Sequence, residues 1–92
     1  MDITHRQETT KGAFSVNIDG KIEAEMTYSK AGDQRIIIDH TEVSDVLRGK
    51  GVGKQLVMAA VEFARESNIK ILPLCPFAKS VFDRVQEIRD VL

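Results

Sequence analysis

A glycine-rich segment, residues 48–54, constrains the fold more than any other part of this sequence, because the hydrophobic pattern changes across it. Residues 35–41 form a short apolar stretch typical of a strand, and residues 51–67 carry apolar side chains at the spacing of an amphipathic helix. Glycines at such a junction allow positive φ angles and close approach of a ligand, and the unpaired N–H groups of a helix start attract anions. The segment therefore predicts a phosphate-binding loop, the alternative being a glycine-rich turn with solvated lysines. Its residues are Arg48, Gly49, Lys50, Gly51, Val52, Gly53 and Lys54.

Alternating apolar and polar side chains dominate the N-terminal half. Two such runs, residues 14–18 and 21–28, flank an Asp-Gly pair, which is typical of a tight β-hairpin. Residues 3–9 favour a further short edge strand. The stretch at 35–41 contains three consecutive isoleucines, which predicts a central strand covered on both faces. We therefore expect an antiparallel sheet in this half.

The second half continues with a helix and a returning strand. The apolar stretch at 69–74 follows the helical pattern directly, so it should run parallel to the strand before the glycine-rich segment. Pro76 suits the first position of a second helix, which makes Cys75 its N-cap residue. The sequence thus predicts an α+β fold in one domain, residues 1–92, with a mixed, mostly antiparallel sheet and two helices.

Composition excludes several classes of protein. A chain of 92 residues supports one hydrophobic core, and a formal net charge of -1 shows no global basic field for nucleic acid. The one cysteine forms no internal disulfide, and two isolated histidines lack metal-ligand spacing. No apolar run approaches the roughly 18 residues that a membrane span needs. We expect a cytoplasmic monomer without a metal site.

The glycine-rich segment does not match the common nucleotide motifs. In a P-loop, Arg48 would replace the first glycine and Gln55 the magnesium-binding hydroxyl. A dinucleotide-binding motif does not fit either, because its third glycine is missing whether the motif is read from Gly49 or from Gly51. The segment does match Arg-x-x-Gly-x-Gly, with Arg48, Gly51 and Gly53 at the defined positions.

That motif and two further stretches, residues 38–43 and 72–77, resemble the GNAT acetyltransferase superfamily, and in particular its small free-standing acetyl-CoA-binding members. The resemblance covers nearly the whole chain from the hairpin to the second helix, but residues 85–88 depart from the usual pattern. It implies a splayed pair of parallel strands that admits acetyl-CoA or CoA. Backbone groups of Glu42 and Val43 would bond the pantetheine arm, and the pyrophosphate would rest on the amides of residues 49–54 beside Arg48.

The resemblance also raises a question of chemistry. Many GNAT enzymes use a tyrosine on the helix after the last parallel strand as an acid, but that helix here carries phenylalanines. Cys75 at the start of this helix is a candidate nucleophile, and His40 is a candidate base for it or for an incoming amine. We predict that Cys75 and His40 form a pair. The alternatives are a small buried cysteine and a hydrogen-bonded strand histidine.

Three other residues have two interpretations each. Glu42 is a second candidate base or a solvated carboxylate, Lys79 a contact to a cofactor phosphate or a surface lysine, and Arg48 a cofactor ligand or an ion-pair partner.

Two functions remain open. The chain is either an N-acetyltransferase that transfers acetyl to an amine or peptide, directly or through a cysteine, or a non-catalytic module that binds or senses acetyl-CoA or CoA.

Overall fold

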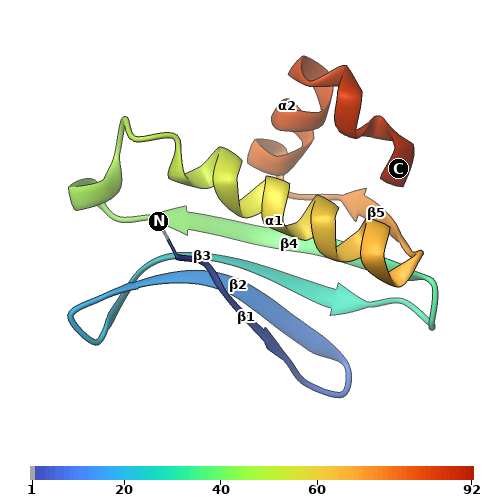
Figure 1. Cartoon of the computed structure of the whole chain (residues 1–92), viewed down its shortest axis with the longest axis horizontal. Coiled ribbons are helices and arrows are strands. Elements are labelled where there is room, and N and C mark those ends of the chain that lie inside the picture. The colour runs from blue at the N-terminus through green and yellow to red at the C-terminus, as the bar shows by residue number, and fades with distance from the viewer. Residues whose placement is uncertain (1) are drawn as a thin grey trace.

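The computed structural model describes residues 2–92, which form one five-stranded sheet and two α-helices (Figure 1). The strands lie in chain order, β1 to β4 are antiparallel, and β5 runs parallel to β4. The predicted mixed, mostly antiparallel α+β fold is confirmed. The elements are β1 (Thr4–Gln7), β2 (Lys11–Ile18), β3 (Lys21–Lys30), β4 (Arg35–Val43), the 3₁₀ helix η1 (Asp45–Leu47), α1 (Val52–Ser67), β5 (Lys70–Pro73), α2 (Pro76–Arg84) and the 3₁₀ helix η2 (Gln86–Val91).

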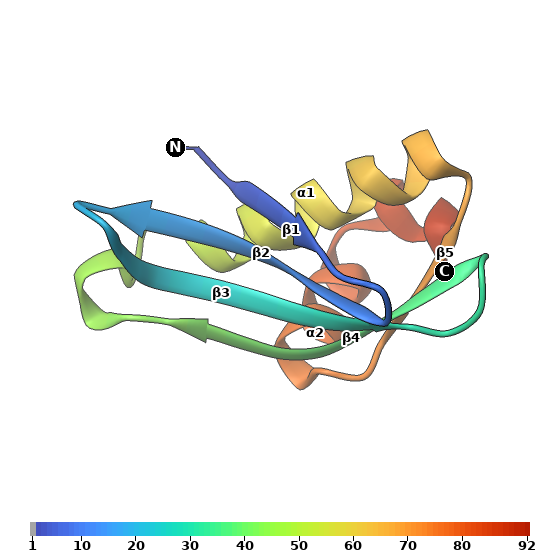
Figure 2. The same cartoon turned by 90° about the horizontal axis from the view of Figure 1, so that it is seen from below.

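The hydrophobic core lies between α1 and the sheet. Helix α1 contacts β2, β3, β4 and β5, while α2 packs against α1 and against β4 and β5 (Figure 2). The spacing of three and four residues places the apolar side chains of α1 on the side that faces the strands. The fully buried core side chains of α1 are Leu56, Val57, Ala60, Val61 and Ala64, and those of the strands include Met26 and Ile38.

Strand β4 is covered on one face only, which corrects the prediction from its three isoleucines. Ile36 and Ile38 are buried, whereas Ile37 between them is half-buried and His40 is exposed. Since side chains alternate between the two faces of a strand, this pattern indicates a single covered face. Part of the surface opposite α1 is therefore open beside the end of β4.

A β-bulge interrupts the pairing of β3 with β4. Thr27 lies opposite His40, but the next residue, Tyr28, lies opposite Ile38, so Asp39 is the extra residue. One extra residue reverses which side chains face each side of a sheet. Beyond the bulge, Thr41 therefore faces the core side, as does its buried partner Met26, and His40 faces the other side.

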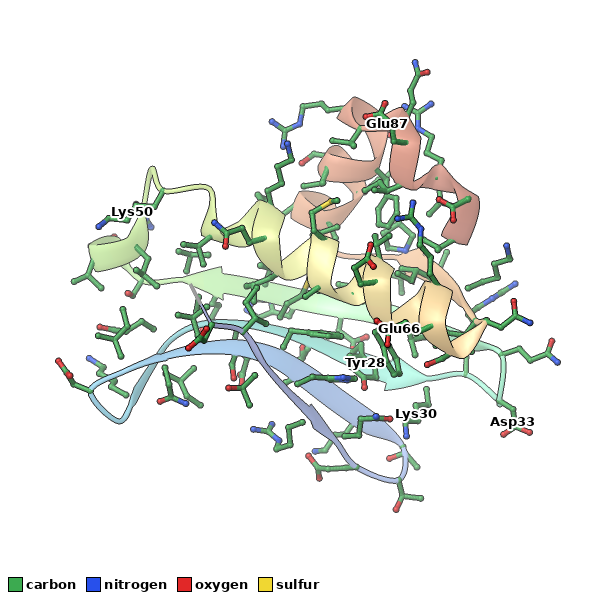
Figure 3. The ribbon with its side chains drawn as sticks, viewed as in Figure 1. Tyr28, Lys30, Asp33, Lys50, Glu66 and Glu87 are labelled. Atoms are coloured by element: carbon green, nitrogen blue, oxygen red, sulfur yellow. The ribbon has the colours of Figure 1, made fainter. Side chains whose placement is uncertain are left out.

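Strand β1 is held to the core by an aromatic cluster around His5. Its Nε2 lies 2.6 Å from the hydroxyl of Tyr28, a buried residue beneath α1 (Figure 3). The imidazole stacks on Phe14 with ring centroids 4.1 Å apart and meets the edge of Phe63 at 4.5 Å. Burial, and secondarily the charge of Lys30, lowers the pKa of His5. The fold therefore favours the neutral imidazole.

We expect this cluster to make stability depend on pH. A histidine whose pKa is lowered by folding stabilises the fold while it is neutral. The free energy of unfolding should therefore fall as the pH drops below the ordinary value of 6.5, and level off below the lowered value of the folded state. Urea titrations across this range measure the effect.

A pair of histidine variants isolates the contribution of this cluster. His5→Gln should flatten the pH dependence, whereas His40→Gln, which alters an exposed histidine outside the cluster, should leave it in place. Identical pH profiles for the native chain and His5→Gln would contradict the assignment.

Residues 86–91, in a segment whose course the sequence left open, form η2 and pack against α1. Ile88 and Val91 are buried. The guanidinium of Arg65 donates to both carboxylate oxygens of Asp90, at 2.8 and 3.1 Å. The C-terminal segment thus belongs to the same core.

Within residues 2–92, no helix has the length and hydrophobicity that crossing a membrane requires.

Candidate functional site

Strands β4 and β5 separate at the centre of the molecule. Their pairing ends at Ile38 and Pro73, yet β4 continues to Val43 while the other chain segment turns into α2. The carbonyl of Ile38 accepts hydrogen bonds from the amides of Leu74, at 3.1 Å, and Cys75, at 3.0 Å. Residues 39–43 extend past the last β4–β5 pair. The geometry opens one backbone edge of β4 beside the start of α2.

The glycine-rich loop follows directly, and its three glycines have different structural roles. Gly49 and Gly51 have φ angles of 77° and 71°, in the left-handed region that other residues resist. Gly51 is also the N-cap of α1. A Cβ on Gly53 would lie 2.5 Å from the ring of Phe77, so this position allows α1 and α2 to meet. The loop therefore needs glycine for backbone conformation at two positions and for space at the third.

A groove of about 520 Å³ lies between this loop and α2. The start of α1 and basic side chains from two helices and the loop line it, which suits an elongated anionic ligand. Most of the predicted cofactor-binding residues meet here, but Glu42 and Lys50 do not line it; Lys50 lies on the loop that leads into α1 (Figure 3). The lining residues are Thr41, Val43, Leu47, Arg48, Gly49, Gly51, Val52, Gly53, Lys54, Phe77 and Arg84.

Sequence reasoning missed four groove residues, which are Thr41, Leu47, Phe77 and Arg84. The last two are seven residues apart on α2, a spacing of about two helical turns that places them on one face. That spacing is the signal that could have found them. Lys79 does not line the groove. Both interpretations of Arg48 have support, since it lines the groove and its Nε lies 3.1 Å from a carboxylate oxygen of the exposed Asp45.

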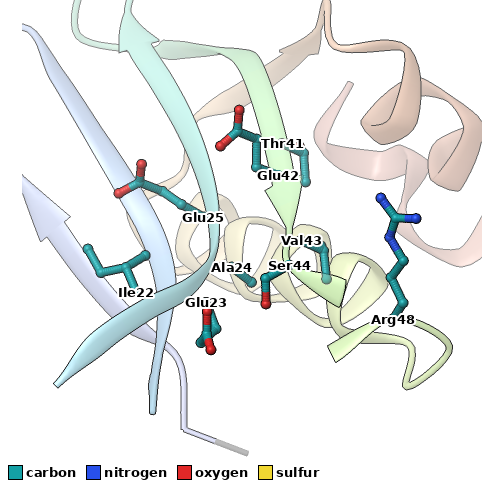
Figure 4. Close-up of a pocket in the computed structure, with 9 residues that line it drawn as sticks. All are labelled: Ile22, Glu23, Ala24, Glu25, Thr41, Glu42, Val43, Ser44 and Arg48. Carbon is teal, nitrogen blue, oxygen red and sulfur yellow. The ribbon is translucent and has the colours of Figure 1, made fainter. Parts of the chain in front are cut away.

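A second cavity, of about 620 Å³, adjoins this groove at the end of β4 (Figure 4). The two spaces share Thr41, Val43 and Arg48. Glu25 and Glu42 lie directly opposite each other on β3 and β4 and both line the second cavity. Two carboxylates in this relation repel each other. The end of β4 is thus accessible from two spaces of different electrostatic character.

Cys75 is the N-cap residue of α2 and is 6% exposed. Its thiol donates a hydrogen bond to the hydroxyl of Thr41 at 3.4 Å. Burial raises the pKa of the thiol, but hydrogen bonds from Thr41 and from backbone amides in the first turn of α2 lower it, and the net pKa lies below its ordinary value. A helix start stabilises a thiolate in this way. The position combines restricted access with an acidified thiol.

The structure does not bring His40 to Cys75. Nε2 of His40 lies 3.0 Å from a carboxylate oxygen of Glu42, and both side chains are exposed. The bulge at Asp39 is the physical reason, because it directs Thr41 rather than His40 toward the thiol. The predicted pair is therefore replaced by two separate contacts, Cys75 with Thr41 and His40 with Glu42.

We expect Thr41→Val to raise the pKa of Cys75 and to slow its alkylation at neutral pH, because the isosteric methyl group cannot bond the thiolate. Thr41→Ser keeps the hydroxyl and should retain the native profile. The rate of iodoacetamide modification as a function of pH measures both. A native profile in Thr41→Val would show that the amides of α2 alone acidify the thiol.

Comparison with known proteins identifies relatives in sequence and in fold. The profile of the GCN5-related N-acetyl-transferase family matches residues 13–91. Protein NATD1 of Xenopus tropicalis is 36% identical over 63 residues, which cover 67% of this chain and 58% of that protein. The chain thus spans little more than half the length of this curated relative.

Two solved structures share the fold. A GCN5-like protein from Staphylococcus aureus, known from a solution structure, is 42% identical with a TM-score of 0.73, over 96% of this chain and 85% of that one. A GNAT family acetyltransferase from Elizabethkingia anophelis, solved with acetyl-CoA bound, has a TM-score of 0.60 at 15% identity, over 71% of this chain and 43% of that one. The chain belongs to the GCN5-related N-acetyltransferase family.

Proposed function

We propose that this chain binds acetyl-CoA in the groove between the glycine-rich loop and α2 and transfers the acetyl group to an amine. The observation that carries the proposal is the groove itself, in which the start of α1 meets the unpaired end of β4. Membership of the acetyltransferase family supports it, as does the shared fold with a protein solved with acetyl-CoA bound.

The ligand would lie along the groove in a defined order. Its diphosphate would accept hydrogen bonds from the amides at the start of α1, beside Arg48 and Lys54, and each such contact contributes about 0.3 to 2 kcal/mol. Its pantetheine arm would bond the free backbone edge near Val43 as a further strand does. The thioester would then reach the branching point of β4 and β5, near Thr41 and Cys75.

Cys75 supports a two-step transfer. Its thiolate would attack the thioester carbonyl, forming S-acetyl-Cys75 and releasing CoA as a thiolate, which then takes a proton. The amine would attack the new thioester, regenerate the cysteine and leave as the amide after losing a proton. His40 faces away from the thiol and is bonded to Glu42, which lines the second cavity. It is therefore better placed as a base for the amine than for Cys75.

Intact mass spectrometry after mixing with acetyl-CoA tests this function. The native chain should gain one acetyl group, Cys75→Ser should gain none, and His40→Gln should still form the adduct while releasing it more slowly to an added amine. Direct transfer without an intermediate would release CoA in the presence of an amine and show no adduct. Absence of binding to acetyl-CoA would refute the proposal.

A non-catalytic role in binding acetyl-CoA or CoA is the second candidate. It is favoured by the limited exposure of Cys75 and by the absence of a tyrosine from α2, whose aromatic residues are Phe77 and Phe82. Ligand at about a hundred times its dissociation constant stabilises a protein by about 2.7 kcal/mol, on the order of 10 to 20 °C for a domain of this size. Such a shift, without an adduct or CoA release across a panel of amines, supports the binding module.

A further inference from the structure

The groove has two walls, and one of them is formed by α2. Phe77 and Arg84 reach the groove from the first and last turns of this helix. Seven residues of helix span about 10 Å. The backbone positions of Phe77 and Arg84 are therefore about 10 Å apart along this wall, and Phe77 marks the end of the wall that meets Gly53 at the start of α1. The basic charge on this wall is separate from that of the loop.

Arg84 has no acidic partner among residues 2–92, where every ion pair involves other residues. Its Nε donates to the carbonyl of Ser80 at 3.2 Å, which fixes the side chain along its own helix. Arg65, by contrast, forms an ion pair with Asp90. The terminal nitrogens of Arg84 thus remain available to a ligand in the groove.

Coenzyme A carries two separated phosphate centres, the diphosphate and the 3′-phosphate of its ribose. The amides at the start of α1, with Arg48 and Lys54, suit the diphosphate, which leaves the charge on the opposite wall for the second centre. A guanidinium binds a phosphate through paired hydrogen bonds. We infer that Arg84 binds the 3′-phosphate and makes the groove selective for coenzyme A over its 3′-dephospho form. This inference rests on the proposed function.

Calorimetric titration with CoA and 3′-dephospho-CoA tests the assignment. The native chain should bind CoA about tenfold more tightly than the dephospho form, as expected for one charge-assisted contact at an exposed site. Arg84→Gln should remove this preference by weakening CoA binding alone. Lys79→Gln is the matched control, because Lys79 is an exposed cation on the same helix that does not line the groove, and it should keep the native preference.

The possible results separate this inference from the proposed function. Equal affinity of the native chain for both ligands, or equal weakening of both by Arg84→Gln, overturns the assignment and leaves coenzyme binding in place. Failure of the native chain to bind either ligand overturns both. If Arg84→Gln does not fold, Arg84→Lys provides the test: it keeps the charge without the planar fork, and it should show an intermediate preference. A fully native preference in Arg84→Lys also overturns the bidentate contact.

Discussion

Replacing Gly53 by alanine is expected to weaken acetyl-CoA binding by about tenfold or more while the chain remains folded. The new Cβ would lie 2.5 Å from the Phe77 ring, so the ring must move. Phe77 is 38% exposed and lines the groove. Its ring therefore has room to move into the groove, where it would narrow the space for the ligand. Alanine itself favours the helix by up to about 1 kcal/mol. Calorimetry and a melting curve measure the two effects separately.

The double variant Gly53→Ala with Phe77→Ala is the decisive control. Removing the ring removes the clash, so the double variant should bind acetyl-CoA more tightly than Gly53→Ala alone. If the single variant binds as the native chain does, the ring does not limit access to the groove. If the double variant binds no better than the single one, the loss has another cause, such as blocked approach to the helix amides.

Gly12→Ala is expected to have the largest effect on stability. Gly12 lies in β2, where a Cβ would clash with the ring and hydroxyl of Tyr28 and approach the backbone oxygen of Arg6 to 2.7 Å. Tyr28 is only 1% exposed and its hydroxyl is bonded to His5, so neither neighbour can move freely. Overpacking of this kind costs about 1 to 3 kcal/mol, which corresponds to roughly 5 to 20 °C in melting temperature.

Gly20→Ala provides the comparison, since a Cβ added there would have no atom within 4 Å. The loss of stability in this variant comes instead from the φ angle of 82°. Such backbone strain is worth roughly 1 to 2 kcal/mol. We expect Gly12→Ala to melt at the lower temperature and also to increase hydrogen exchange in β1, which Gly20→Ala should not do. Equal melting temperatures without that local change would show that β1 accommodates the methyl group.

The elements that could be predicted from sequence are those with local signals. The hairpin forms at Asp19 and Gly20, which both take positive φ angles, as the favoured two-residue turn requires. Cys75 caps α2 with Pro76 in the first turn, because proline needs no hydrogen-bond acceptor there. The glycine-rich loop was equally local, and most of its residues do line the groove.

The parts that were missed depend on tertiary structure. Asp39 has no sequence signature of a bulge. Its insertion nevertheless places Thr41, rather than His40, on the side of β4 that faces Cys75. The covered face of β4 was misjudged because consecutive isoleucines do not reveal which neighbours pack against them. Arg84 was overlooked because a basic residue at a helix end is usually solvated, and only the packing of α2 beside α1 directs it to the groove.

The carbonyl of Ile38, which accepts two amide hydrogens where β4 and β5 diverge, has a consequence for the rate of ligand capture. The pairing of β4 with β5 ends at this residue, and the two hydrogen bonds to its carbonyl oxygen hold the diverging strands in place. A ligand therefore need not break any strand pairing on arrival, and the ordering of this backbone has been completed during folding. Association should consequently show a single kinetic phase that is linear in ligand concentration, without a preceding isomerisation.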